Sequence, residues 1–142
     1  MRNVTNQILK AWFELLDQNI SVPVYRTDAP PNETGNYVLL RVESETDKTN
    51  NSRWVTQPVI ITEIVCRFGI RIDDSVAPGI DDEIAQLLFS APGANSLPVQ
   101  SNIFITDVRR QNATYINEDD GTFRIHRLIT RNLHRVQQLV TT

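Results

Sequence analysis

Little in this sequence points to an extracellular domain or to a membrane protein. Its 142 residues contain a single cysteine, Cys66, so no disulfide can form within the chain. No apolar run approaches the ~18 residues of a membrane-spanning helix, and the first residues lack the apolar region of a secretory signal. A chain of this length buries a core without disulfides or metal ions. We therefore expect one soluble domain, made in a reducing cytoplasm.

An excess of charge of one sign is also missing. The chain has 14 Lys and Arg residues against 17 Asp and Glu residues, and its formal net charge is -3. A balance this mild provides no bulk attraction to nucleic acid or to an anionic membrane. Binding to DNA or to a membrane through overall charge is therefore not expected.

A recognisable catalytic constellation is absent as well. Cys66 falls on the apolar face of a predicted strand, which is typical of a buried thiol. His126 and His134 have no nucleophile, and no second histidine at metal-ligand spacing, near them in the sequence. One acidic group matches no calcium-loop spacing and suits the start of a helix; its members are Asp73, Asp74, Asp81, Asp82 and Glu83. The sequence thus predicts no enzyme, no cofactor and no metal site.

The longest apolar stretch, residues 58–72, predicts the strand around which the fold is organised. Its even positions are nearly all apolar and its odd positions are mixed, as in a β-strand with one face on a core. Its many β-branched residues argue against a helix. At about 3.3 Å per residue the strand would reach roughly 50 Å. We therefore expect it to bend near Gly69 or to extend past the body of the domain.

Two helices and several strands are expected around this stretch. Apolar residues recur at helical spacing from about Val4 to Gln18, with Trp12 as a core anchor, and again from about Val76 to Ser90. Further strands are expected over residues 22–27, 37–44, 102–110 and 122–136. This order predicts an α+β fold with a mostly antiparallel sheet of four or five strands and two helices packed on one face. No repeat or linker divides the chain, so residues 1–142 are expected to form a single domain.

Residues 43–57 form a polar segment that we expect to be a long loop. Loops of about this length in compact domains are usually functional or disordered. Trp54 has two interpretations here: it begins the next strand and packs on the sheet edge, or it anchors a protein partner. The candidate interface residues in this segment are Glu43, Glu45, Asp47, Lys48, Arg53 and Trp54.

The last predicted strand is the one basic element. Arg127, Arg131 and Arg135 share one of its faces with apolar residues. They form a solvated strand face paired with acidic neighbours, a charged interface between subunits or, third in order, a contact for nucleic acid. We include all three among the candidate interface residues.

The order of features along the chain has a counterpart in a known family. An amphipathic helix is followed by Val24-Tyr25, by Asp28-Ala-Pro-Pro, by the strand Tyr37-Val-Leu-Leu-Arg-Val and by a polar segment. A long strand then ends at Ile72-Asp73, a helix follows, and Glu118-Asp-Asp-Gly-Thr-Phe-Arg124 opens the last strand. In this order the sequence resembles the tail-completion or tail-terminator proteins of tailed bacteriophages, which are small neck proteins of about this size.

The resemblance implies a structural role in a virion, without chemistry. Proteins of this family form homo-hexameric rings at the head-proximal end of the tail, where they stop tail growth and join head to tail. The implied partners are further copies of the chain, the tail tube protein and the head or neck connector proteins, with assembly in the host cytoplasm. DNA would pass through the ring without specific binding. The alternative function is a small non-catalytic ligand-binding or regulatory domain.

Overall fold

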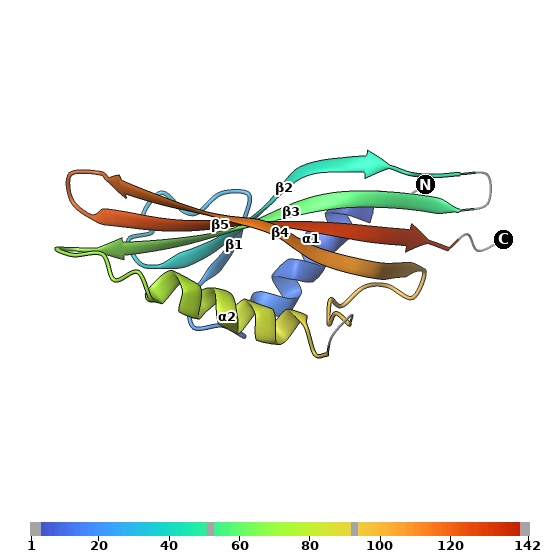
Figure 1. Ribbon diagram of the computed structural model, residues 1–142, viewed down its shortest axis with the longest axis horizontal. Helices are drawn as coiled ribbons and strands as arrows, with labels where there is room; N and C mark the ends of the chain where they lie inside the picture. Colours follow the sequence, from blue (N-terminus) through green and yellow to red (C-terminus); the bar gives the residue numbers. More distant parts are fainter. Residues whose placement is uncertain (1–3, 51–52, 92–93, 140–142) are drawn as a thin grey trace.

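The chain folds as one twisted sheet with two helices. The computed structural model describes residues 4–50, 53–91 and 94–139. Along the chain it contains α1 (Val4–Leu16), β1 (Val24–Arg26), β2 (Tyr37–Asp47), β3 (Trp54–Phe68), α2 (Val76–Leu88), β4 (Ile103–Asp119) and β5 (Arg124–Gln138). The strand order is β1-β2-β3-β5-β4, with β1 parallel to β2 and the other neighbours antiparallel (Figure 1). The predicted α+β fold with a mostly antiparallel sheet is confirmed.

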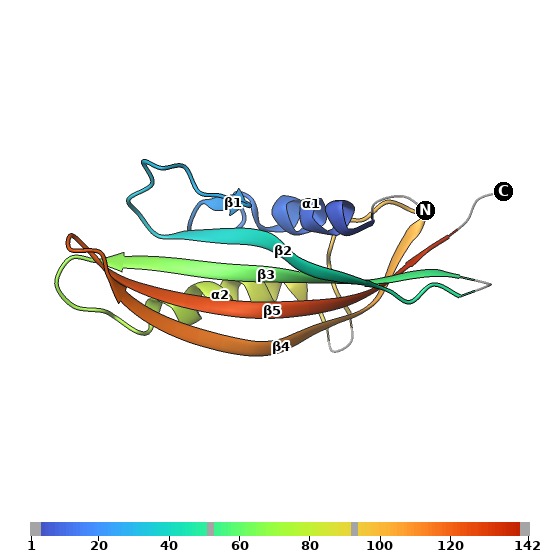
Figure 2. The same cartoon turned by 90° about the horizontal axis from the view of Figure 1, so that it is seen from above.

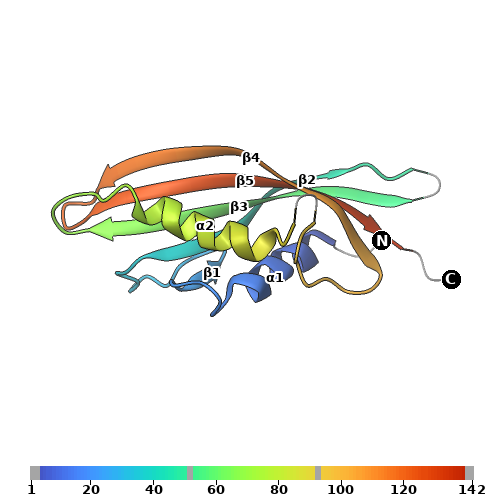
Figure 3. The same cartoon turned by 60° about the horizontal axis from the view of Figure 1, so that its bottom comes forward.

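Both helices contribute to one core on the same face of the sheet. Their buried residues recur at helical spacing and include Ile8, Trp12 and Leu16 in α1 and Ile80, Ile84 and Leu88 in α2. They pack with the even-numbered positions of β3, such as Ile60 and Ile64. Figure 3 shows the two helices along this face. The opposite face, which carries no helix, is called the open face below.

The central strand β3 is buried over most of its length, because its even-numbered side chains pack in the helical core and Val65, on the other face, packs with Tyr37 and Ile125. It runs from Trp54 to Phe68 rather than over the predicted 58–72. The strand starts earlier because its first residues pair with β5, beginning with Trp54 opposite Gln138. It ends earlier because Phe68, opposite Arg124, is its last residue with a strand partner. Gly69 follows directly, where a bend was expected.

The hairpin of β4 and β5 is longer than the sequence pattern indicates. The expected strand over 102–110 continues to Asp119, with bulges after Ile105 and Arg110. Residues 111–119 are exposed and do not alternate between apolar and polar, so their pattern resembles a loop. Backbone pairing with β5 makes them a strand nonetheless. The turn contains Gly121, whose φ of 89° lies in the left-handed region that favours glycine.

A hydrogen-bonded histidine joins the helical layer to the sheet. The Trp12 Nε1–H donates to His134 Nε2 at 2.8 Å, and His134 Nδ1 lies 3.0 Å from the carbonyl oxygen of Pro58. Because Nε2 accepts, the ring proton is on Nδ1, which donates to Pro58. Trp12 is therefore the predicted core anchor, and it also fixes the tautomer of a fully buried histidine.

The two hairpins point to opposite ends of the molecule. The β2–β3 hairpin extends past the helices at one end, whereas the β4–β5 turn lies at the other (Figures 1 and 2). Within the described ranges, neither helix is long and apolar enough to cross a bilayer.

Candidate assembly interface

The polar segment 43–57 forms a hairpin rather than the predicted loop. Strand β2 continues to Asp47 and β3 begins at Trp54, with Glu45 opposite Pro58 and Asp47 opposite Thr56. The prediction was wrong because the side chains on the β2 side are exposed and polar, so no apolar alternation marks the strand. Pairing of the backbone with β3 is sufficient to hold it. We call this hairpin, residues 43–57, the arm.

The arm has one buried strand and one exposed strand. On the β3 side, Val55 and Thr56 are buried between neighbouring strands. On the β2 side, every residue from Glu43 to Asp47 is exposed. A bulge between Val42 and Ser44 separates this exposed part from the buried first half of β2. The arm therefore presents an acidic strand at one side of the sheet.

Local hydrogen bonds define the tip of the arm. The Thr49 amide donates to Asp47 Oδ1 at 2.8 Å, and the Arg53 amide donates to Asn50 Oδ1 at 3.0 Å. Hydrogen bonds from the Thr49 hydroxyl and amide hold the pKa of Asp47 below its ordinary value. Lys48 and Arg53 have exposed side chains. The tip thus combines the Asp47 carboxylate, which is ionised at neutral pH, with the exposed cations of Lys48 and Arg53.

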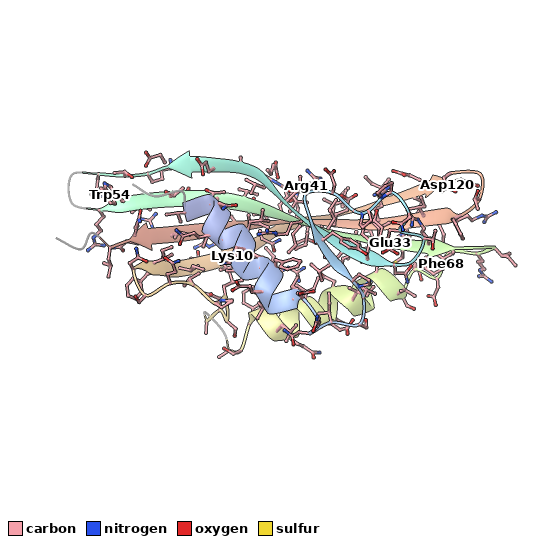
Figure 4. The ribbon with its side chains drawn as sticks, turned by 180° about the vertical axis from the view of Figure 1, so that it is seen from behind. Lys10, Glu33, Arg41, Trp54, Phe68 and Asp120 are labelled. Atoms are coloured by element: carbon pink, nitrogen blue, oxygen red, sulfur yellow. The ribbon has the colours of Figure 1, made fainter. Side chains whose placement is uncertain are left out.

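Trp54 is the first residue of β3, as in the first of its two interpretations. Its side chain is partly buried, and its backbone lies opposite Gln138. Figure 4 places it at one end of the molecule, far from Glu33, Phe68 and Asp120 at the other end. A role as anchor for a partner stays a prediction.

The three arginines of β5 lie on the open face, but they differ in their partners. Arg127 Nη1 is 2.8 Å from Glu63 Oε1, and Arg131 Nε is 2.7 Å from Glu43 Oε2. Arg135 is exposed and has no ion pair among the described residues. Arg127 and Arg131 therefore form ion pairs with acidic residues of the same chain, whereas the charge of Arg135 is not compensated by any described residue.

A row of alternating charges crosses the open face. Glu63 on β3 is flanked by Arg41 of β2 at 3.9 Å and by Arg127 of β5 at 2.8 Å. Arg127 also lies 3.3 Å from Glu118 of β4. Glu63 is only 8% exposed, so these arginines compensate a nearly buried carboxylate. Sequence reasoning missed this row because its members come from four strands.

A loop covers the open face at the end opposite the arm. The Tyr25 hydroxyl donates to the Glu33 carboxylate, which also accepts the Gly35 amide at 2.8 Å. The Tyr25 hydrogen bond is the main cause that lowers the pKa of Glu33, and the same bond raises the pKa of Tyr25. Arg67 joins the loop through its amide, which donates to Asn36 Oδ1 at 2.9 Å. Side-chain hydrogen bonds of Tyr25, Glu33 and Asn36 thus hold this loop against the sheet.

Ionisable groups that could suggest chemistry are engaged in structural contacts. Cys66 lies directly opposite His126 on neighbouring strands, a proximity that their sequence separation hides. Burial raises the pKa of the Cys66 thiol to about 11, so the thiol stays protonated at neutral pH. In the acidic group, Asp81 pairs with Arg110 and the Glu83 carboxylate accepts the Ser21 hydroxyl at 2.7 Å. The described parts of the chain contain no cluster of three metal-ligating side chains.

The fold and its exposed arm define a class of protein, a small α+β domain with a projecting polar hairpin and no cluster of three metal-ligating side chains among the described residues. No protein-family model and no curated protein matches the sequence. The fold is similar to that of a chain in a solved structure described as "Virion of native gene transfer agent (GTA) particle". The TM-score is 0.69 at 15% identity, and the alignment covers 95% of this chain and 99% of that chain. The two chains share a fold over almost their whole lengths.

Proposed function

We propose that this protein is a structural component of a phage-like particle and forms a ring at the head-proximal end of the tail. The observation that carries the proposal is the projecting arm, whose acidic strand is exposed over its whole length although Glu43 pairs with Arg131 and Glu45 accepts a hydrogen bond from Thr5. The fold similarity to a virion chain, over nearly the full length of both, supports the same role. In this role the protein acts as a tail terminator or completion protein and is not an enzyme.

The ring would be a homo-hexamer with two kinds of contact. Neighbouring copies would meet side by side, and the tail tube and the head or neck connector proteins would stack on the two rims. The exposed residues of the arm and the exposed Arg135 are the proposed contact residues, because their side chains lie outside the core. The balanced charges of the open face and the net charge of -3 suit a ring through which DNA passes without binding.

The alternative, a ligand-binding domain, has less support from the surface. Ligand pockets usually measure about 300–1,000 Å³. A hollow beside α1, lined by Lys10, Glu14 and Val99 among others, measures about 260 Å³. Another, at Arg71–Asp74, measures about 340 Å³. The first is below this range, and the second is at its lower end and is lined mainly by exposed side chains.

Measuring the mass of the purified protein tests the proposal. Light scattering should give a hexamer, and negative-stain images should show rings, alone or on the ends of tail tubes. Replacing residues 47–56 by Asn-Gly should close a two-residue turn between Thr46 and Gln57, which are already paired. This shortened protein should fold but no longer join tails.

Asp28→Asn is a suitable control, because Asp28 is exposed on the loop that follows β1, outside the arm. A monomeric protein at every concentration, with or without tail tubes, would contradict the ring and favour the alternative. A shortened protein that still supports tail joining would contradict the role of the arm.

A further inference from the structure

The sheet has two unpaired backbone edges on its opposite sides. β1 pairs with β2 only from Val38 to Leu40, which leaves the outer edge of β2 beyond Val42 without a strand neighbour in the described part of the chain. On the other side, β4 has only β5 as a strand neighbour. An unpaired edge presents a row of free N–H and C=O groups that another strand can join.

These two edges lie at the same level along the strands. Val42 pairs with Ile60, Ile60 with Asn132, and Asn132 with Arg110. At the far end of the arm, Asp47 pairs with Thr56, Thr56 with Val136, and Val136 with Ile105. The free part of β2, residues 42–47, is therefore level with residues 105–110 of β4, across the full width of the sheet.

The directions of the two edges are also compatible. Three antiparallel steps separate β2 from β4, so the two strands run in opposite directions. A second copy, rotated about an axis along the strands, would keep the direction of its β2. That strand would then run antiparallel to β4 of the first copy. Because the edges are level, no shift along the axis is needed, and a rotation without a shift closes a ring rather than building a filament.

The charges of the two edges are complementary. Residues 42–47 carry Glu43, Glu45 and Asp47 and no basic residue. Residues 105–110 carry Arg109 and Arg110 against a single acidic residue, Asp107. The Arg109 side chain is 74% exposed and lies 2.5 Å from Asp107 of its own strand, whereas Arg110 is paired with Asp81 of α2. Opposite charges on facing strands stabilise the pairing and select the partner.

We infer that β2 of one copy, from Val42 to Asp47, adds as an antiparallel strand to residues 105–110 of β4 in the next copy. The inference deepens the proposed function, on which it rests, by naming the joint between subunits. Hydrogen bonds between backbones would continue the sheet from one copy to the next around the ring. Ser44 of the arm, next to the acidic Glu43, would face Arg109 of the neighbouring copy.

A pair of cysteines tests this joint. Ser44 pairs with Val59, Val59 with Leu133, and Leu133 with Arg109, so Ser44 of one copy should lie opposite Arg109 of the next. The protein with Ser44→Cys and Arg109→Cys should form a ladder of disulfide-linked oligomers under mild oxidation, because directly opposed strand residues are close enough for a disulfide. The native Cys66 is fully buried and does not compete.

The control pair is Ser44→Cys with Thr114→Cys. Thr114 is exposed, and it lies on the same strand and the same face as Arg109. Its register partners are Ile129, then Glu63, then Leu39, so it is level with Leu39 and not with Ser44. This pair should give no ladder, and each single variant should give dimers at most. Mass measured under reducing conditions reports whether each variant still assembles.

The outcomes separate the joint from the ring. A ladder from the Ser44 and Arg109 pair alone supports the joint. A protein that assembles under reducing conditions but gives no ladder, or gives it with the control pair, overturns the joint and leaves the ring standing. A wild-type protein that is monomeric with and without tail tubes overturns both.

Discussion

At the scale of single residues, His134 couples the stability of the fold to pH. Burial lowers its pKa to about 4, from an ordinary value of 6.5. The neutral ring accepts a hydrogen bond from Trp12 and donates one to Pro58, so a second ring proton would lose the Trp12 bond and bring a charge into the core. The folded protein therefore resists protonation that the unfolded chain accepts.

We predict that the free energy of unfolding falls as the pH drops from 6.5 to about 4. In this window the unfolded chain binds a proton that the folded chain does not, so protonation favours unfolding. The full loss from this one group is roughly 3 kcal/mol, from about 1.36 kcal/mol per pKa unit. Urea unfolding across this pH range measures it.

His134→Gln is the matched variant for this measurement. It should be less stable than the wild type at pH 7, because the core hydrogen bonds are altered, but its stability should change less between pH 6.5 and 4. Carboxylates with lowered pKa, such as Glu33 and Asp120, add their own losses only at the acid end of the range. An equal slope in both proteins would show that His134 is not the titrating group.

The candidate interface residues were only partly predictable at this scale. Strict alternation along β5 placed Arg127, Arg131 and Arg135 on one face, as the structure has them. Their partners were not predictable, because Glu63 and Glu43 reach them from other strands through a register that no local pattern encodes. A sequence shows which residues share a face, but tertiary pairing decides which charges are already compensated.

At the scale of elements, the helices were predicted well and the strand ends poorly. The apolar stripes of α1 and α2 set their positions to within about two residues at each end, which is typical of helix boundaries. The arm was predicted to be a loop and residues 111–119 were not predicted to be a strand, because strand patterns in a sequence arise from the burial of alternate side chains. A strand whose side chains are all exposed, and which is held only by backbone hydrogen bonds, shows no alternation of apolar and polar residues in the sequence.

Two glycines provide a prediction at the same scale. Gly121 has a φ of 89° in the β4–β5 turn, so Gly121→Ala should destabilise the protein by about 1 kcal/mol, although its side chain would meet open space. Gly79 lies in α2 with no atom within 4 Å of an added Cβ. Gly79→Ala should stabilise the protein by about 0.5–1 kcal/mol, because alanine favours the helix.

Thermal or urea unfolding of the two variants side by side tests this opposition. The same chemical change should have effects of opposite sign, which separates backbone conformation from the added methyl group. Two destabilised variants would mean that α2 does not tolerate a larger residue at Gly79. Two neutral ones would mean that the β4–β5 turn accommodates the Gly121→Ala substitution at little cost.

At the scale of the whole molecule, the shape of the sheet bears on assembly. The monomer has one edge with acidic side chains and another with arginines, level with each other and opposite in direction. A self-complementary pair would need the same patch on both partners, whereas these two different edges favour head-to-tail contacts that repeat around a ring. This asymmetry is a property of the strand order and register, and no single element contains it.

A charge-swap cycle tests the head-to-tail arrangement in solution. Arg109→Glu should weaken assembly, because the new carboxylate would lie beside Glu43 of the next copy. Ser44→Lys should also weaken it, because the lysine would face Arg109. The double variant should regain much of the loss, since lysine and glutamate then face each other across the joint. Sedimentation or light scattering over a range of protein concentrations, at low and high salt, gives the concentration at which half of each variant is assembled.

The expected size of the effect follows from the number of joints. One exposed ion pair contributes about 0.2–1 kcal/mol, but a closed ring repeats the pair at every joint, so a small change per pair shifts assembly steeply. High salt should reduce the differences between variants, because it screens exposed charges. Arg124→Glu is the control, since Arg124 is exposed at the opposite end of β5, level with Phe68, and makes the same change in net charge. Equal weakening by Arg124→Glu and Arg109→Glu, or a double variant as weak as the sum of the singles, would mean that total charge governs assembly and that the two edges do not meet.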